Sequence, residues 1–359
     1  MQRFGFVGLP NTGKSSLYNA LVGQTSALAA PYAFATRDPN VGVAKVPDPR
    51  LDALAEMAGS RNVVPASVQF VDIGGLVEGA SKGEGLGNRF LGNIREVDAV
   101  VYVLRAFVDP NVVGSTDPLE QLRVLEVELS LADLESVGTQ IDKRRKAARA
   151  DGALRGEVDA LDTAEAALSA GTPLYRSGLD DEARKLLQPY FLLTNRPVLA
   201  VVNVGEDQLA DLAAVTRPVE IELGSYAEVL AICVQLEAET AQLDGDEQAE
   251  MLAALGLGEG ALPRFVHAAY HLLDLRTFFS ARENESRAWP FTTGMTAPQC
   301  AGLIHTDFQR GFIRAEVIRW DELLDLGSWS KAREVGKVRT EGKDYEVTDG
   351  DVLEIRFNV

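Results

Sequence analysis

Residues 8–15, GLPNTGKS, fit the phosphate-binding pattern G-x-x-x-x-G-K-[ST]. The glycines allow the backbone to curl so that several N–H groups point at one phosphate. Lys14 would bring its ammonium group to the β- and γ-phosphates, and the Ser15 hydroxyl is a suitable ligand for Mg²⁺. An expected strand, residues 3–8, leads into the pattern and a helical pattern, residues 14–22, follows it. The segment therefore predicts a nucleoside triphosphate site rather than an ordinary glycine-rich turn.

A second motif, Asp72-Ile73-Gly74-Gly75, reads D-x-x-G at the end of an expected strand, residues 67–72. After a phosphate loop, the Asp72 carboxylate could hold Mg²⁺ through a water molecule, and the Gly75 N–H could meet the γ-phosphate. The stretch that follows, GASKGEGLGNRFL, is either a flexible surface loop or a switch that becomes ordered around a γ-phosphate, and its position favours the switch. Thr36, in the loop PYAFATRDPN, is a further candidate Mg²⁺ ligand.

The stretch Asn203-Val204-Gly205-Glu206 stands where a GTPase would carry N-K-x-D. The Asp of that motif accepts hydrogen bonds from N1–H and N2–H₂ of guanine, and Glu206, one methylene longer, would be displaced from this contact. A site built for one hydrogen-bonding ligand rejects a mismatched one strongly. Asn203 can still support a base, and the Val204 backbone can meet the edge of adenine. The motif therefore predicts ATP over GTP, the alternative being an ordinary strand end with the base bound elsewhere.

Leu76 follows D-x-x-G directly, at the position where Ras-type proteins carry the glutamine that orients the attacking water. The leucine side chain can neither donate nor accept a hydrogen bond. We therefore expect slow intrinsic hydrolysis, with charge stabilisation by Lys14 and Mg²⁺ as the main contributions. Lys14 is accordingly the single catalytic candidate.

The composition narrows the class of protein and of partner. The 359 residues are enough for roughly two domains. No apolar run approaches the ~18–20 residues of a membrane span, and the first residues lack the features of a secretory signal. Only Cys233 and Cys300 occur, without metal-type spacing, which fits a reducing cytoplasm. The net charge of −18 opposes loose binding to nucleic acid, so we expect neither a membrane nor DNA as partner, and any RNA contact needs a local basic face.

Strand and helix patterns alternate over most of the chain, which is typical of an α/β fold with a parallel sheet wound on both faces by helices. The expected strands are 3–8, 41–46, 67–72, 99–104, 198–203 and 229–233, with helices at 14–22, 48–58 and 86–97. A last amphipathic helix is expected at 262–277. After it, short strands at 291–296, 312–318, 345–347 and 352–359 and one helix at 297–305 predict a small mixed domain.

The interval 118–196 has a different pattern. Asp117 followed by Pro118 is a good helix start, because a capping side chain precedes proline at the first helical position. Leucines at near-helical spacing, the charged block KRRKAARADG and a second helical repeat then predict two long helices in an antiparallel hairpin. A thin apolar stripe and heavy charge favour a hairpin that projects from the sheet over an insertion buried against the core.

Two basic clusters and a histidine pair are open to more than one interpretation. The clusters near the hairpin tip and in the C-terminal region could each meet RNA or be ordinary solvated surface; they are Lys143, Arg144, Arg145, Lys146 and Arg149, and Lys331, Arg333, Lys337, Arg339 and Lys343. His267 and His271 have the i, i+4 spacing of a zinc pair, but the metalloprotease pattern fails because residue 268 is Ala. We interpret them as packed or half-exposed side chains. Cys233 is interpreted as a small packed residue near the base pocket.

With these motifs in place, the chain resembles the YchF, or Obg-like, ATPase family of P-loop proteins over nearly its whole length. The resemblance is carried by GLPNTGKSSLYNAL, DPNVGV, VDIGGLVEGASKGEGLGNRFL, IHTDFQRGFIRAEVI and EGKDYEVTDGDVLEIRFNV. It implies a nucleotide-binding domain at residues 1–276 with the helical hairpin inserted at about 118–196, and a β-grasp TGS domain at residues 277–359.

The resemblance also implies functional residues and partners. Ser15 and Thr36 would ligate Mg²⁺, and the phosphates would be held by Asn11, Thr12, Gly13, Lys14, Ser15 and Ser16. ATP would be the nucleotide and the ribosome the partner. Members of the family usually carry a histidine in the loop after the fourth strand, whereas the loop 109–118 of this sequence is shorter and lacks it.

The function predicted from the sequence is thus an ATP-binding, slowly hydrolysing molecular switch. Two alternatives remain at this point. One is a GTPase of the Obg kind, which the N-x-x-E motif opposes. The other is a ribosome- or RNA-binding stress protein that uses ATP as a structural ligand, which the missing histidine favours.

Overall fold

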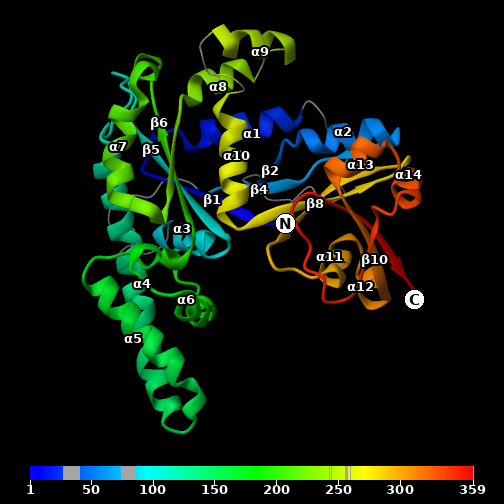
Figure 1. Cartoon of the computed structure of the whole chain (residues 1–359). Coiled ribbons are helices and arrows are strands. Elements are labelled where there is room, and N and C mark those ends of the chain that lie inside the picture. The colour runs from blue at the N-terminus through cyan, green and yellow to red at the C-terminus, as the bar shows by residue number, and fades with distance from the viewer. Residues whose placement is uncertain are drawn as a thin grey trace. The chain divides into compact units, whose positions relative to one another are not determined.

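The computed structural model describes residues 1–26, 41–73, 86–241, 243, 245–254, 258 and 260–358 (Figure 1). The chain forms two compact units. The first comprises Met1–Ala44 and Gln69–Phe265, and the second comprises Lys45–Val68 and Val266–Val359. Within the described part of the chain, no helix is both long and apolar enough to cross a membrane.

The first unit is built on a six-stranded sheet with the order β2-β4-β1-β5-β6-β7. Every pairing from β4 to β7 is parallel. All positions of β5 and β6 are buried, as expected for central strands covered on both faces. The strands are Arg3–Val7 (β1), Val41–Lys45 (β2), Ser67–Asp72 (β4), Ala99–Arg105 (β5), Val198–Asn203 (β6) and Glu228–Ile232 (β7).

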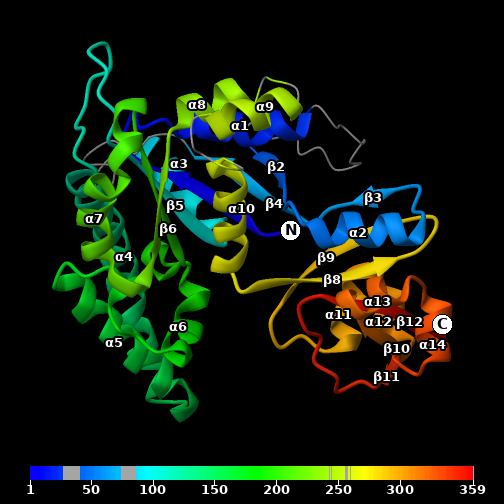
Figure 2. The ribbon, with the colours of Figure 1, turned by 45° about the horizontal axis from the view of Figure 1, so that its top comes forward.

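Helices cover both faces of this sheet (Figure 2). On one face, apolar side chains of α3, α4 and α7 join those of β5 and β6 in one core. On the other face, Phe265 of α10 packs with Phe6 and Phe70, with ring centroids 6.0 and 5.3 Å away. The predicted doubly wound α/β fold is therefore confirmed. The helices are α1 (Lys14–Ser26), α3 (Leu86–Arg95), α4 (Pro118–Ala148), α5 (Arg155–Ser169), α6 (Asp181–Leu187), α7 (Leu212–Leu223), α8 (Val234–Thr240), α9 (Gly245–Ala254) and α10 (Ala261–Leu272).

The predicted helical hairpin is α4 and α5. Asp117 caps α4, since its side chain accepts hydrogen bonds from the N–H groups of Leu119 and Glu120. The first half of α4 contributes buried leucines to the sheet core, whereas its second half packs with α5 and α6 in a separate apolar cluster. Each of the two interpretations considered for this insertion thus describes one half of α4. The separate cluster, here called the hairpin core, consists of Val137, Ile141, Ala160, Leu161, Ala164, Leu168, Leu174, Leu187 and Leu192.

The second unit contains a mixed six-stranded sheet with the order β11-β10-β12-β8-β9-β3. β12 and β8 are parallel, while β10–β12 and β8–β9 are antiparallel. The strands are Val63–Val64 (β3), Leu275–Ala281 (β8), Ser286–Thr292 (β9), Phe312–Arg319 (β10), Arg339–Glu341 (β11) and Asp351–Phe357 (β12). The helices are Pro49–Ala58 (α2), Ala297–Ile304 (α11), Thr306–Arg310 (α12), Trp320–Leu326 (α13) and Trp329–Glu334 (α14).

Four sequence predictions for this unit are wrong. The helix predicted at 262–277 ends at Leu272, because Asp274 adopts a left-handed conformation with φ of 53° and the chain then enters β8. The strand predicted at 291–296 is β9, which lies several residues earlier. Residues 345–347 form no strand, only an isolated bridge from Glu346 to Thr296. In addition, α12, α13 and α14 accompany α11, where one helix was predicted.

The segment 45–68 folds with the second unit, although in sequence it lies between two strands of the first sheet. The Arg50 guanidinium bonds both carboxylate oxygens of Asp48, donates to Asp349 Oδ2 at 2.7 Å and lies 5.1 Å from the centre of the Phe279 ring. β3 pairs with β9. Part of the stretch 1–276 that was assigned to nucleotide binding therefore belongs structurally with the C-terminal sheet.

Candidate nucleotide-binding site

Residues 8–13 connect β1 to α1, which begins at Lys14, and they adopt the curled backbone that the sequence predicts. Asn11 and Gly13 have φ angles of 64° and 94°. A Cβ atom on Gly8 would lie 2.5 Å from the Val103 carbonyl oxygen, and one on Gly13 would lie 2.3 Å from Asn203 Nδ2. Both positions therefore require glycine, which explains the spacing of the motif.

Lys14 is buried, with 6% of its surface exposed, and its Nζ donates to the Leu9 carbonyl at 2.7 Å. Burial lowers the pKa of Lys14 to about 8, against the opposing effect of the nearby Asp72 carboxylate. Thr12 is also buried, and its hydroxyl donates to the same Leu9 carbonyl at 3.1 Å. The side chains of Lys14 and Thr12 thus hold the loop from inside. Because the Thr12 hydroxyl is occupied, Thr12 would contact a phosphate through its backbone.

Ser15 and Asp72 lie together although 57 residues separate them in sequence, and Ser15 Oγ donates to Asp72 Oδ2 at 2.6 Å. A hydroxyl and a carboxylate are oxygen donors of the kind Mg²⁺ prefers. Among the described residues no group of three or more His, Cys, Asp or Glu side chains could hold a metal ion. The donor set fits Mg²⁺, which uses one or two protein oxygens together with phosphates and water. Thr36, Gly75 and Leu76 lie outside the described residues.

A cavity of about 650 Å³ opens beside the phosphate loop, with Gly13 and Ser16 in its wall. The rest of the wall comes from the segment 107–112 after β5, the segment 203–207 after β6, and α8. These segments follow the carboxyl ends of parallel strands, which is where α/β folds bind nucleotides. Two of the predicted phosphate residues, Gly13 and Ser16, and the N-x-x-E residues therefore border one cavity.

Asn203 braces this cavity with both ends of its side-chain amide. Its Nδ2 donates to the Thr12 carbonyl at 3.0 Å, and its Oδ1 accepts from the Val234 N–H at the start of α8 at 3.2 Å. The Val204 N–H donates to the Ile232 carbonyl at 3.0 Å, so its carbonyl is the backbone group with which it could meet a base. In this structure Asn203 joins the phosphate loop to α8, which refines its expected role of supporting the base.

Phe107 and Arg105 were missed in the sequence. Phe107 lines the cavity, and the buried Arg105 guanidinium lies 4.5 Å from the centre of its ring. One signal was available, because Arg105 is the single charged residue of the otherwise apolar strand AVVYVLR. Its contacts are to loop carbonyls, which no residue pattern reveals.

The two helix histidines and Cys233 have ordinary structural contacts. His267 Nε2 lies 2.6 Å from the Pro47 carbonyl oxygen, and His271 Nδ1 lies 3.3 Å from Arg276 Nη1. Cys233 is buried at the start of α8, and burial raises the pKa of its thiol. These contacts give no support to a histidine metal site or a cysteine nucleophile.

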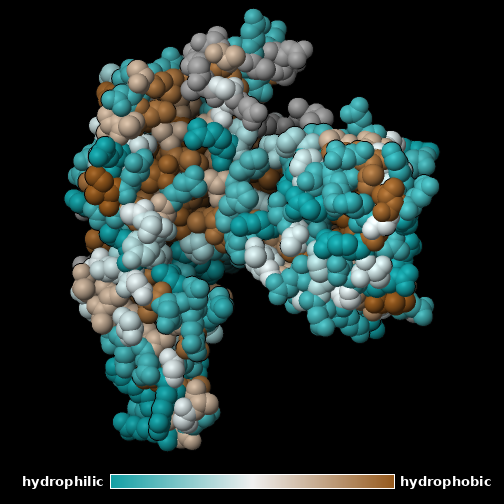
Figure 3. All heavy atoms as spheres, viewed as in Figure 1, coloured by the Kyte–Doolittle hydropathy of each residue, from teal (hydrophilic) through white to brown (hydrophobic). Residues whose placement is uncertain are grey.

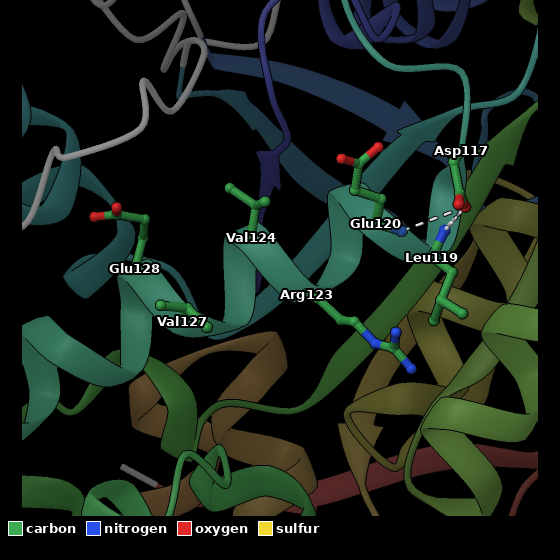
Figure 4. Close-up of a pocket in the computed structure, with 7 residues that line it drawn as sticks. All are labelled: Asp117, Leu119, Glu120, Arg123, Val124, Val127 and Glu128. Carbon is green, nitrogen blue, oxygen red and sulfur yellow. Dashed lines mark hydrogen bonds between the residues drawn. The ribbon is translucent and has the colours of Figure 1, made fainter.

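A second hollow, of about 330 Å³, follows the first turns of α4. Figure 4 shows Asp117 capping the helix and the side chains of Glu120, Arg123, Val124, Val127 and Glu128 along it. Three carboxylates and one arginine are among its seven lining residues. Since the P-loop motif borders the larger cavity, that cavity is the candidate nucleotide site.

Comparison with known proteins places the chain in a family. It is 46% identical to the protein named "Ribosome-binding ATPase YchF" of Bacillus subtilis (strain 168), over 99% of both chains. The chain belongs to the YchF family. The protein of the same name from Haemophilus influenzae is 44% identical over 99% of both chains. The YchF-GTPase_C family, described as a protein of unknown function, matches residues 275–358, and a family described as "50S ribosome-binding GTPase" matches residues 3–139.

Solved structures agree with the membership of the YchF family. The structure titled "Structure of the Schizosaccharomyces pombe YchF GTPase" has a TM-score of 0.89 and 30% identity, and the match covers 99% of this chain and 97% of that one. A GTP binding protein from Pyrococcus horikoshii OT3 shares the fold, with a TM-score of 0.62 at 18% identity. YchF proteins are named both ATPase and GTPase. The preference of this chain for adenine or guanine therefore has to be argued from its own residues.

Proposed function

We propose that this YchF-family protein binds ATP with Mg²⁺, hydrolyses it slowly, and associates with the ribosome in the cytoplasm according to the nucleotide it holds. The observation that carries this proposal is that the phosphate loop and the N-x-x-E segment border one cavity, while Ser15 of the same loop is hydrogen-bonded to Asp72. Curated relatives that match over 99% of both chains are named ribosome-binding ATPases, which supports the same function.

In this function the backbone of Asn11 to Ser16 holds the phosphates, with the curl at Asn11 and Gly13 turning N–H groups inward. Lys14 leaves its present acceptor, the Leu9 carbonyl, to place its charge on the β- and γ-phosphates. Ser15 and Asp72, with Thr36, would hold Mg²⁺, which when bound neutralises charge on those phosphates. Gly75 would donate its N–H to the γ-phosphate.

Slow hydrolysis follows from what the chain lacks in sequence. Its histidines are His267, His271 and His305, so the loop after β5 has none, and Leu76 cannot orient a water molecule. Charge stabilisation by Lys14 and Mg²⁺ remains. Turnover by the isolated protein at the rate of a partner-activated enzyme would contradict this proposal.

The base preference rests on Glu206 and on the Val204 carbonyl. That carbonyl can accept from the 6-amino group of adenine, whereas guanine presents an oxygen there, and Glu206 is displaced from the position that reads guanine. Titration of the nucleotide-free protein with Mg²⁺–ATP and Mg²⁺–GTP tests the preference. Tighter binding of GTP would instead support the Obg-type alternative.

The two expected switch loops are connected along the chain to a segment of the second unit. β2 follows the first expected switch loop, and β4 precedes the second. The two strands are joined by residues 45–68, and this segment folds with the second unit. Residues 31–40 and most of 74–89, which we propose reorganise with the nucleotide, lie largely outside the described residues. In functional terms we retain residues 1–276, with the hairpin at 118–196, as the nucleotide-binding part and residues 277–359 as the TGS domain.

The hairpin tip is the better candidate for an RNA contact. Arg144 and Arg145 are paired with carboxylates, but Lys143, Lys146 and Arg149 form no ion pair within the described part of the chain. In the C-terminal cluster Arg333, Lys337 and Arg339 are paired, and of its five cations only Lys331 and Lys343 form no ion pair with a described residue. Figure 3 shows mainly hydrophilic residues over the end of the hairpin. Three solvated cations close together suit a phosphate backbone despite the negative net charge.

Co-sedimentation with ribosomes in ATP, in ADP and in a non-hydrolysable ATP analogue tests the switch. We expect binding that differs between ATP and ADP. Equal binding in all nucleotides would support the alternative in which ATP is a structural ligand, an alternative that the missing loop histidine favours. Replacing Lys143, Lys146 and Arg149 by Gln should weaken ribosome binding while leaving ATP affinity unchanged.

A further inference from the structure

Arg105 is a buried cation at the end of β5. Only 2% of its surface is exposed, and it is among the largest fully buried side chains of the described chain. An ionised group in such a place is costly unless hydrogen bonds compensate for its lost hydration. None of the ion pairs formed by the described residues involves Arg105, so its compensation must come from neutral acceptors.

Those acceptors all belong to the segment 106–117, here called the wall loop. Arg105 Nε donates to the Phe107 carbonyl at 3.0 Å, and Nη1 donates to the Val112 and Val113 carbonyls at 3.2 and 3.5 Å. The guanidinium also lies 4.5 Å from the centre of the Phe107 ring. The planar fork of arginine can serve several acceptors in fixed directions, which an ammonium group cannot do. One side chain thus fixes both ends of the 107–113 stretch.

Gln121 of α4 holds the other end of the wall loop. It is 1% exposed, and it exchanges two hydrogen bonds with the backbone of Arg105, at 2.8 and 2.7 Å. Its Nε2 also lies 3.1 Å from the carbonyl oxygens of Ser115 and Asp117. The wall loop therefore rests on two buried polar side chains, and that of Gln121 also bonds the backbone of Arg105.

The wall loop is also attached to both motifs of the nucleotide site. Asn11 Nδ2 of the phosphate loop donates to the Val113 carbonyl at 3.3 Å. Gln208 accepts from the Gly205 N–H at 2.8 Å and donates to the Ala106 carbonyl at 3.2 Å, which links the N-x-x-E segment to the start of the loop. Because Phe107 and Val112 line the cavity, the position of the loop sets the distance between its two walls.

We propose that Arg105 is a positioning residue for the base and ribose of the nucleotide. It holds the wall loop and the Phe107 ring in place as one side of the cavity and does not touch the nucleotide itself. The phosphate loop holds the triphosphate through Lys14, Ser15 and its backbone N–H groups, and none of these contacts Arg105. Only the Asn11 side chain shares an acceptor with Arg105, the Val113 carbonyl. This inference rests on the proposed nucleotide function of the cavity and adds the residue that shapes its base-binding half.

The test compares Arg105→Lys with the unaltered chain and with Arg196→Lys as a matched control. Arg196 is partly buried and, like Arg105, donates to a backbone carbonyl, that of Arg95, but it precedes β6 and lies outside the cavity wall. Calorimetry measures the Kd of Mg²⁺–ATP, of Mg²⁺–ADP and of inorganic tripolyphosphate. We expect Arg105→Lys to weaken ATP and ADP binding about tenfold or more, with tripolyphosphate within about twofold and Arg196→Lys near the unaltered values.

Unchanged ATP affinity in Arg105→Lys would overturn the inference, as would an equal loss for ATP and tripolyphosphate, because that would indicate a general structural role. If Arg105→Lys does not fold, Phe107→Leu serves as the second variant, since it leaves the guanidinium bonds to the carbonyls intact. Phe107→Leu should weaken ATP but not tripolyphosphate, and unchanged ATP affinity would overturn the inference. Failure of the unaltered chain to bind any nucleotide would instead refute the proposed function, and this inference with it.

Discussion

At the scale of single residues, Lys14 gives the nucleotide site a dependence on pH. Burial lowers its pKa to about 8 in the free protein, and a bound triphosphate would raise that pKa again because it favours the charged amine. The binding energy from this charge is therefore fully present below about pH 8 and is lost as the pH rises through the pKa of the bound state. We expect ATP affinity to be flat from pH 7 to 8 and then to fall by up to about tenfold per pH unit.

Isothermal titration at constant Mg²⁺ concentration between pH 7 and 9.5 measures this slope. Lys14→Arg is the matched control, because a guanidinium stays protonated over the whole range. A flat profile in the unaltered protein, or the same slope in Lys14→Arg, would show that another group titrates.

A second residue-scale prediction concerns Gly13. Alanine there would place Cβ 2.3 Å from Asn203 Nδ2 at a φ of 94°, so the brace between the phosphate loop and α8 would have to shift. We expect Gly13→Ala to abolish measurable ATP binding and to lower the free energy of unfolding by about 1–3 kcal/mol. Gly23→Ala in α1 is the control, since its Cβ would meet nothing within 4 Å. Normal ATP binding by Gly13→Ala would exclude a tight fit of the loop.

At the scale of elements, local sequence patterns were informative about a helix or strand wherever that element packs on one face. The strands of the first sheet and the capped start of α4 were predictable, because an apolar period and a capping residue are local features. β8 was hidden, since LRTFFSA continues the helical spacing of α10 and the break depends on the left-handed Asp274. The phosphate loop was recognisable for the same local reason. The braces by Arg105, Gln121 and Asn203 were not, because they join residues up to 191 positions apart.

The hairpin core and the sheet core should be energetically distinct, because separate sets of side chains build them. Leu161 of α5 is fully buried in the hairpin core. We expect Leu161→Ala to destabilise the hairpin by about 2–5 kcal/mol, from the lost transfer energy and the cavity left behind, while ATP affinity stays within about twofold. Val127→Ala on the exposed side of α4 should cost well under about 1 kcal/mol. Hydrogen exchange in α5 and nucleotide titration separate the two effects, and a large loss of ATP affinity would show that the cores are coupled.

At the scale of the whole molecule, the chain enters the second unit twice, once at residues 45–68 and once after residue 265. Arg50 provides a charged link between these two parts of the unit, alongside hydrogen bonds from Ser60 and Asn62 to the segment 282–286. It donates to Asp349, and its guanidinium lies over the ring of Phe279 in β8. The segment that joins β2 to β4 is thereby anchored to the C-terminal sheet by an ion pair and a ring contact, not only by the short β3–β9 pairing.

This anchor should make the second unit sensitive to acid. Burial opposes ionisation of Asp349, but hydrogen bonds from the Arg50 side chain and from the Thr277 N–H, with the charge of Arg50, lower its pKa below the usual range. A carboxyl with a lowered pKa in the folded state stabilises above its unfolded pKa, and that contribution is lost as the pH falls through the folded value. We expect the unfolding temperature of the second unit to fall below about pH 4.

Arg50→Ala should lower the free energy of unfolding of the second unit by about 1–3 kcal/mol at pH 7, because a charged hydrogen-bond network is removed. It should also flatten the acid dependence, since Asp349 would lose the partner that lowers its pKa. Hydrogen exchange of β8 and β12 at pH 7 and at about pH 3 measures both effects on the intact chain. Arg61→Ala is the control, because its pair with Glu283 is about 75% and 72% exposed and should contribute little. If Arg50→Ala leaves exchange in β8 unchanged, the segment 45–68 is held by β3 and its other contacts without help from Arg50.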